Sequence, residues 1–187
     1  MFDAPGETWT DREFDGENFV ESDLADLTTT GCTFVGCDFA DANLTLSRHS
    51  NSTFVACTFG GARLTDARFD GCKLTGSMMV DAQVRGTTFT TCDLTRTALG
   101  GLKLRGRDLS QSRLTEANLV DTDLRECSFA GADLRGVRLG NTDLRDADLR
   151  GALLDVFDPR LADLRGAHID VGHAMLLVGV FGVRLGG

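Results

Sequence analysis

Four carboxylates are separated by multiples of twenty residues. They are Glu21, Asp41, Asp81 and Asp121. Glycines fill positions 61 and 101 of this series, Asn141 continues it, and no Lys or Arg enters it. Carboxylates held in line on a rigid support would present a row of negative charge, as duplex DNA presents phosphates about 3.4 Å apart along each strand. The series, with Asp38 and Asn118 beside it, therefore favours imitation of DNA towards a protein that binds DNA.

Five arginines form a second series at a constant spacing of twenty. They are Arg85, Arg105, Arg125, Arg145 and Arg165. Guanidinium groups in a row suit phosphates, which favours direct nucleic-acid binding as one hypothesis. However, an Asp lies two residues before each of the last three arginines, on the same side of an extended strand. We therefore expect a neutralised charge ladder, in which each exposed pair contributes at most ~1 kcal/mol, and no direct nucleic-acid binding.

Motifs of catalysis are missing from the chain. The sequence contains no phosphate-binding Gly-rich loop with Lys, no nucleophile elbow and no histidine pair at metal-ligand spacing. His168 and His173 flank Asp170 and are interpreted as surface histidines near the start of a helix. The sequence thus predicts neither an enzyme nor a cofactor or metal site.

A five-residue repeat must position these side chains. Every fifth residue from 9 to 169 gives thirty-three positions without an insertion, and thirty are apolar; only Thr29, His49 and Pro159 depart from the pattern. A small residue usually lies two places earlier. In a helix, side chains five residues apart are rotated by 500°, so they spread around the axis. In a straight strand, side chains five residues apart point to opposite faces. Neither element therefore gathers the apolar series on one side. A chain that turns a corner every five residues does, and it forms a solenoid.

The arginine spacing indicates four sides to each coil, because a fifteen-residue coil would align Arg85 with Gly100 instead. The fold class is therefore an all-β solenoid of about eight coils, a rod roughly 38 Å long. We divide the chain into a flexible lead-in at residues 1–8, a solenoid at 9–170, and a C-terminal helix and tail at 171–187.

Several polar residues fall at inward positions. All six cysteines take the small position, which favours reduced structural thiols over a metal site or disulfides. Thr29 and His49 lie one coil apart in the same column, which predicts a mutual hydrogen bond or a local distortion rather than a catalytic histidine. Arg107 also takes a small position, close to Gly100 and Gly101, which predicts a bulge or an altered turn.

The C-terminal segment is apolar on nearly all sides. Asp170 is placed to cap a helix that starts at Val171. One face of this helix can cover the last coil, and the other then needs a partner, most simply a second copy of the chain. The expected dimer interface consists of Val171, Ala174, Met175, Leu177, Val178 and Phe181. Leu185 continues the stripe of Ala174, Leu177, Val178 and Phe181, while Val171 and Met175 belong to a second stripe. The segment is too short for a membrane anchor.

Charge is distributed unevenly along the chain. The net charge is −9, and residues 1–47 carry eleven acids against one base. An acidic end repels nucleic acid and membranes and attracts basic protein surfaces, although solubility alone is the simpler explanation. No signal peptide and no apolar run of eighteen residues is visible, so we expect a cytoplasmic location.

The repeat resembles the pentapeptide repeat family, whose A-(D/N)-L-x-x motif occurs at residues 117–119, 132–134, 147–149 and 162–164. This resemblance implies a right-handed quadrilateral β-helix. Residues 98–101, 119–125 and 146–152 and the tail from 169 to 187 are similar to the mycobacterial MfpA-type fluoroquinolone-resistance proteins of that family. The likeness implies a C-terminally joined homodimer that mimics DNA, binds and inhibits DNA gyrase, and lowers drug action.

The expected gyrase-facing acidic surface consists of Glu21, Asp38, Asp41, Asp81 and Asp121. Two other hypotheses stay open. One is a pentapeptide repeat scaffold for a partner other than gyrase, and the other is nucleic-acid binding through the arginine series.

Overall fold

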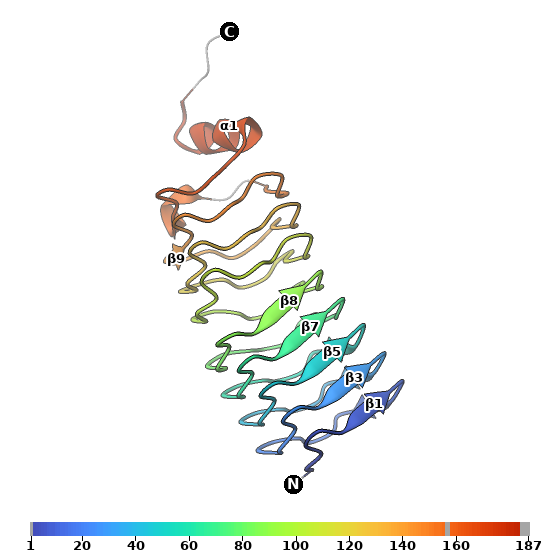
Figure 1. The fold of residues 1–187 in the computed structure, drawn as a ribbon. Helices are drawn as coiled ribbons and strands as arrows, with labels where there is room; N and C mark the ends of the chain where they lie inside the picture. Colours follow the sequence, from blue (N-terminus) through green and yellow to red (C-terminus); the bar gives the residue numbers. More distant parts are fainter. Residues whose placement is uncertain (1, 156–157, 184–187) are drawn as a thin grey trace.

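The chain forms an elongated stack of coils, with β1 at one end of the rod and α1 at the other (Figure 1). The structure is a computed structural model and describes residues 2–155 and 158–183. Each coil takes twenty residues and has four sides, so the fold is the expected right-handed quadrilateral β-helix of about eight coils with one C-terminal helix. This regularity lets a residue at one position lie directly beside its equivalent twenty residues later.

Parallel pairing between coils connects the sides into sheets. The first sheet contains, in order, β1 (Thr8–Thr10), β3 (Thr28–Thr30), β5 (Arg48–Ser50), β7 (Arg68–Asp70) and β8 (Thr88–Thr90). The second contains β2 (Glu13–Asp15), β4 (Thr33–Val35) and β6 (Thr53–Val55), and the third pairs β9 (Thr142–Asp143) with β10 (Ala162–Asp163). Each partner lies twenty residues away, and single bridges continue the same register elsewhere.

The corners explain why the chain can turn every five residues. From Gly6 to Gly166, corner residues have φ angles between 49° and 77°, in the left-handed region. Gly, Asp and Asn reach this region at the lowest cost among common residues. The sequence accordingly supplies Gly, Asp or Asn at most corners.

Aromatic side chains stack along the rod axis in the N-terminal coils. Phe34 lies parallel to Phe14 and to Phe54, with ring centroids 4.9 and 4.7 Å apart. The column of Phe19, Phe39 and Phe59 repeats this geometry at 4.8 and 4.9 Å. Leucines at the equivalent positions continue the buried core towards the C-terminus.

Residues at the small position join one coil to the coil before it. All six cysteines are buried and free, as expected. The thiol of Cys72 donates to the carbonyl oxygen of His49 at 3.2 Å, and the Ser77 hydroxyl donates to that of Phe54 at 2.8 Å. Burial raises the pKa of Cys72 to about 11 and that of Cys57 to about 12. These thiols therefore stay protonated and support the wall of the solenoid.

The polar pair in the inward column forms the predicted mutual hydrogen bond. Thr29 Oγ1 lies 2.8 Å from His49 Nδ1, and Ser47 Oγ lies 3.0 Å from His49 Nε2. The imidazole stacks on Phe69, with ring centroids 4.7 Å apart. Burial lowers the pKa of His49 to about 3, so the ring is neutral and structural.

The solenoid contacts extend into the segment assigned from sequence to a lead-in. Ala4 is buried, and its N–H donates to the carbonyl oxygen of Asp23 at 2.9 Å. The Phe2 ring packs edge-on against Trp9 and Phe19. Ala4 takes an inward position of the same five-residue series, which is why the first coil begins before Thr8.

The C-terminal end contains two short departures from the strand pattern. Pro159–Leu161 form a 3₁₀ turn, η1, in place of one side of the last coil, and Asp158 accepts a hydrogen bond from the Arg160 N–H. Helix α1 (Val171–Val180) follows, and Asp170 caps it by accepting from the His173 N–H at 3.0 Å. The predicted cap and helix start are both confirmed.

Candidate functional site

The four carboxylates spaced by multiples of twenty share one corner of the solenoid, which we call the acidic corner. Glu21, Asp41, Asp81 and Asp121 are all exposed, with φ angles of 55° to 60°. The carboxylate of Asp41 lies over the next corner, where any side chain in place of Gly61 would collide with it. The sequence therefore placed these acids correctly in one column, although the left-handed backbone also favours Asp there for conformational reasons.

Asp38 lies beside the acidic corner, on the flat side that precedes it. Its carboxylate accepts the Ala40 N–H at 3.0 Å, just as Asn18 accepts from Val20 at 2.9 Å and Asn118 from Val120 at 3.3 Å. Asp38 thus supports a local turn, and an Asn does the same in two other coils. Its negative charge adds to the surface without being required for the turn.

Across the described part of the chain, no cation compensates these five carboxylates. None of them forms an ion pair with a residue that the structure describes. Residues 2–92 carry fourteen acids and six bases, and this described segment contains no ion pair at all. The first pair along the chain joins Asp93 to Arg113, with 3.2 Å between oxygen and nitrogen. The N-terminal half of the rod therefore presents an uncompensated negative surface, which the sequence spacing alone did not reveal.

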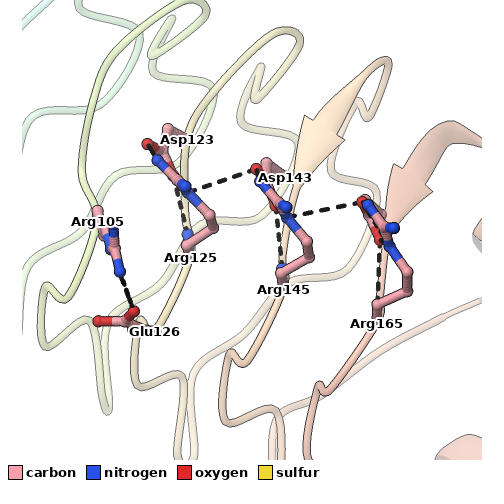
Figure 2. Close-up of polar contacts among 8 residues, drawn as sticks. Arg105, Asp123, Arg125, Glu126, Asp143, Arg145 and Arg165 are labelled. Atoms are coloured by element: carbon pink, nitrogen blue, oxygen red, sulfur yellow. Dashed lines mark hydrogen bonds and ion pairs between the residues drawn. The ribbon is translucent and has the colours of Figure 1, made fainter.

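The C-terminal half contains the predicted arginine ladder, shown in Figure 2. Arg125 binds Asp123 through two hydrogen bonds of 2.8 and 2.6 Å, and Arg145 binds Asp143 through bonds of 2.9 and 2.6 Å. Arg165 binds Asp163 in the same way. Arg125 and Arg145 also approach the acid of the next coil: Arg125 Nε lies 3.5 Å from Asp143 Oδ2, and Arg145 Nε lies 3.7 Å from Asp163 Oδ2.

These pairs lower the charge that the ladder offers to a phosphate. The Arg165 hydrogen bond lowers the pKa of the Asp163 carboxyl to about 2, and the Arg125 hydrogen bond lowers the pKa of Asp123. Both acids are thus ionised at neutral pH and compensate their arginines. The expected neutralised ladder is confirmed for these arginines.

The first two arginines of the series behave differently. Arg105 pairs with Glu126, a corner residue of the next coil. Arg85 forms no ion pair within the described residues, because Gln83 stands where the coils of Arg125, Arg145 and Arg165 carry Asp. The five arginines thus share one column, but they have different electrostatic environments: the last three pair with an Asp of their own coil, and the first two do not.

A strip of small and apolar residues lies beside the acidic corner. It follows the outward positions of the same side and consists of Val20, Ala40, Gly60, Val80, Gly100, Val120 and Gly140. Val80 and the nearby Met78 are about half exposed, at 47% and 49%. Sequence reasoning missed this neutral strip, although its spacing of twenty was a sufficient signal. The acidic corner and the neutral strip together form a side without bases from residue 18 to 121.

Helix α1 lies at the C-terminal end of the rod (Figure 1). Apolar side chains on it and at its C-cap are exposed. Val171, Met175 and Phe181 are 78%, 57% and 62% exposed. The other three expected interface residues, Ala174, Leu177 and Val178, are half-buried. Leu185 lies outside the described residues. The helix thus keeps an apolar face that no part of the described chain covers.

His173 corrects the interpretation of surface histidines. It is buried, its Nε2 lies 2.9 Å from the carbonyl oxygen of Ala152, and its Nδ1 lies 3.3 Å from Asp170 Oδ2. The first turn of α1 folds against the last coil and carries this ring inward. His173 therefore anchors the helix to the solenoid.

Metal-ligating side chains do not gather in the part of the chain that the structure describes. Among residues 2–155 and 158–183, no three His, Cys, Asp or Glu side chains gather in a way that could hold a metal ion. No helix in this described part is long and apolar enough to cross a membrane. The geometry defines a class of protein: a rigid β-solenoid with one acidic side, a charge-paired side and an apolar helix at one end.

Comparison with known sequences assigns the family. A family model described as pentapeptide repeats, with eight copies, matches residues 92–129 and 127–155, and a second, with nine copies, matches residues 34–78. The chain belongs to the pentapeptide repeat family. No match was found among curated protein sequences.

Comparison with solved structures supports the same fold. The chain is similar to a trypsin-treated form of QnrB1, described as a plasmid-mediated fluoroquinolone resistance protein, with a TM-score of 0.87 and 21% identity over 97% of this chain and 91% of that one. A second trypsin-treated form of QnrB1 gives a TM-score of 0.71 and 19% identity over 96% of this chain and 100% of that one. At these identities the likeness concerns the fold.

Proposed function

We propose that this protein binds DNA gyrase in the cytoplasm as a mimic of duplex DNA, inhibits the enzyme and thereby gives protection against fluoroquinolones. The observation that carries the proposal is the uncompensated charge of the acidic corner. Adjacent coils of a solenoid are ~4.8 Å apart, so the corner extends over roughly 24 Å from Glu21 to Asp121. A DNA-binding surface is rich in Lys and Arg, and it would meet carboxylates there without competing bases.

The surroundings of the acidic corner support the same role. Val80 of the neutral strip and the nearby Met78 are half-exposed apolar side chains, which an interface can bury while the carboxylates orient it. The arginine ladder is neutralised and lies on the next side, so it does not repel a basic partner as strongly as free arginines would. The fold shared with a fluoroquinolone resistance protein is consistent with this proposal.

A supercoiling assay with purified gyrase tests the proposal. The sharpest variant changes Glu21→Gln, Asp41→Asn, Asp81→Asn and Asp121→Asn, because amides keep the size of each side chain and Asn suits the left-handed corner. The matched control changes Asp11, Asp26, Asp66 and Asp146 to Asn. These four acids also lie at left-handed corners, with φ of 50° to 59°, but on other edges of the rod.

We expect the parent and the control to inhibit supercoiling at similar concentrations. The acidic-corner variant should need at least about tenfold more protein, equal to about 1.4 kcal/mol of lost binding. If the parent does not inhibit, gyrase is not the target, and the scaffold for another partner becomes the better hypothesis. If both variants weaken inhibition equally, net charge rather than this corner is responsible.

We also propose that α1 joins two copies of the chain. The exposed Val171, Met175 and Phe181 form an apolar face at the end of the rod, where a second copy would continue the rod and lengthen its acidic surface. Light scattering should report a dimer for the parent and a monomer for a Met175→Glu, Phe181→Glu variant. The control Arg138→Glu changes charge on the solenoid and leaves the residues of α1 unaltered. A dimer that survives the helix variant would refute this interface.

A further inference from the structure

The backbone ladder of the solenoid is open between two adjacent coils, over two of the four sides. No backbone hydrogen bond joins residues 81–91 to residues 100–110, both of which the structure describes in full. The residues just before and just after this seam keep their hydrogen bonds to the next coil. The Met79 N–H donates to the Ala98 carbonyl oxygen at 2.9 Å, and the Leu94 N–H donates to the Arg113 carbonyl oxygen at 2.7 Å. The seam is therefore a local opening in an otherwise continuous wall.

Arg107 explains the position of the seam. It occupies the inward small position, which the neighbouring coils give to Ala67, Thr87, Cys127 and Ala147. Its own backbone stays paired with the following coil, since Ser128 N–H donates to the Arg107 oxygen at 3.0 Å. A guanidinium on three methylene groups is too large for an interior site between coils ~4.8 Å apart, so the wall parts on the side of the preceding coil. The predicted bulge is thus replaced by an opened ladder, while the corners at Gly101 and Gly106 keep their normal left-handed φ.

A cleft of about 730 Å³ lies at the seam. Four cationic residues and one acid, Asp81, line it. The cations are Arg85, Lys103, Arg105 and Arg107. Among the described residues, only Arg105 of these four forms an ion pair. This positive cleft lies where the acidic N-terminal half of the rod meets the C-terminal half, since Arg85 comes from the first and Lys103, Arg105 and Arg107 from the second.

Two kinds of polar group at the seam lack partners among the described residues. The Nε of Arg107 is buried without a hydrogen bond from any described residue. The N–H groups of Val84 and Gly86 also lack backbone acceptors, whereas their equivalents one coil earlier, Leu64 and Asp66, donate to the next coil at 3.0 and 2.8 Å. A buried donor without a partner costs free energy, and an anion in the cleft would satisfy the Arg107 donor and the open backbone edge together.

We propose that this seam is a binding site for a small molecule that carries two or three linked phosphoryl groups, with Arg107 as its innermost contact. Three unpaired cations match several negative charges on one ligand, and guanidinium groups bind phosphoryl oxygens with two parallel hydrogen bonds. The volume lies within the range of small-molecule sites and exceeds the space that a single phosphate requires. Ala82, Val84 and Leu102 add an apolar wall on which the organic part of a phosphate ester can pack.

Nuclear magnetic resonance of the full chain can test this site. Tripolyphosphate is the first probe, at 150 mM NaCl, and adenosine triphosphate and guanosine triphosphate are the second and third. We expect saturable shifts confined to the Val84 and Gly86 amides and to the Arg107 Nε–H. Tighter binding of a nucleotide than of tripolyphosphate would identify a nucleotide ligand, and equal binding would identify the phosphoryl chain alone. Orthophosphate at the same ionic strength should bind at least about tenfold more weakly.

Variants separate the site from general attraction to positive charge. Lys103→Ala keeps Arg107 in place and should weaken tripolyphosphate binding at least about tenfold, whereas Lys73→Ala removes an exposed cation from another side and should leave it unchanged. Arg107→Ala restores a small residue, so we expect both loss of binding and slower hydrogen exchange at Val84 and Gly86 as the ladder closes. Arg107→Lys should retain part of the affinity. Shifts spread over all basic residues, or equal binding by Lys103→Ala and the parent, would overturn the proposal.

Discussion

His49 should make the stability of this protein depend on pH between neutrality and pH 5. The ring is fully enclosed, with Thr29 and Ser47 at its two nitrogens and Phe69 on its face. Because burial lowers its pKa to about 3, the folded chain keeps the neutral ring, while the unfolded chain takes up a proton below the ordinary value of 6.5. The contribution of His49 is therefore complete above pH 6.5 and is lost as the pH falls from 6.5 towards 3.

The size of the effect follows from the two pKa values. At pH 5.0 the pH lies about 1.5 units below the pKa of 6.5 that His49 has in the unfolded chain. Protonation of the unfolded chain lowers the free energy of unfolding by about 1.36 kcal/mol for each of these units. The free energy of unfolding should thus fall by about 2 kcal/mol between pH 7.5 and pH 5.0 through this residue. A loss of this size is a large share of the stability of a typical domain.

Urea unfolding of the parent and of His49→Phe at pH 7.5 and pH 5.0 measures the contribution of His49 to the free energy of unfolding. The variant suits a column that continues with Phe69 and Phe89, and Thr29 keeps its contact with Ser52 at 3.0 Å. The carboxylates titrate equally in both proteins, so the difference between the two pH slopes belongs to His49. His49→Gln, which keeps a polar side chain without titration, should follow His49→Phe. Parallel curves for the parent and both variants would refute the reasoning.

Three further predictions concern the core, the thiols and the arginine ladder. Phe54→Ala removes the ring between Phe34 and Phe69 and should cost about 3–5 kcal/mol in urea unfolding, whereas the exposed Val35→Ala should cost less than about 0.5 kcal/mol; equal costs would show that the stacks are not tightly packed. At pH 8 iodoacetamide should modify none of the six buried cysteines in the folded chain and all of them in urea, as read by mass spectrometry, because burial raises the pKa of thiols such as Cys92 to about 12. Rapid labelling of the folded chain would contradict that burial. Replacing Asp123, Asp143 and Asp163 with Asn frees three arginines and should create salt-sensitive binding to duplex DNA in a mobility-shift assay; no gain over the parent would show that the pairs do not mask the ladder.

Much of the fold was predictable because the inward positions repeat without interruption. A period of five fits neither a helix nor a straight strand, so the apolar series specified a chain that turns corners. The spacing of Arg125 and Arg145 indicated that a coil has twenty residues. The Asp that lies two residues before each of these arginines predicted the ion pairs. Each of these inferences relied on residues close in sequence or separated by one coil, where the solenoid keeps neighbours constant.

The features that escaped prediction depend on the environment of single side chains. His173 lies at the end of the repeat, where periodicity gives no direction, and only the docking of α1 showed that the ring is buried. The sequence shows that Arg107 is unusual for its position. It does not show whether the corner changes shape or whether the backbone hydrogen bonds to the preceding coil are lost. The wall opened because the corner glycines keep their conformation while the interstrand hydrogen bonds give way.

The candidate surface shows the same division. The sequence by itself determined that Glu21, Asp41, Asp81 and Asp121 share one line, since a constant coil length fixes which residues stack. Only the tertiary structure decided that no described Lys or Arg pairs with these carboxylates, and that Arg105 pairs with Glu126 while Arg85 has no ion-pair partner among the described residues. The physical reason is that stacking follows from chain length per coil, whereas charge compensation requires side chains to reach one another across three dimensions.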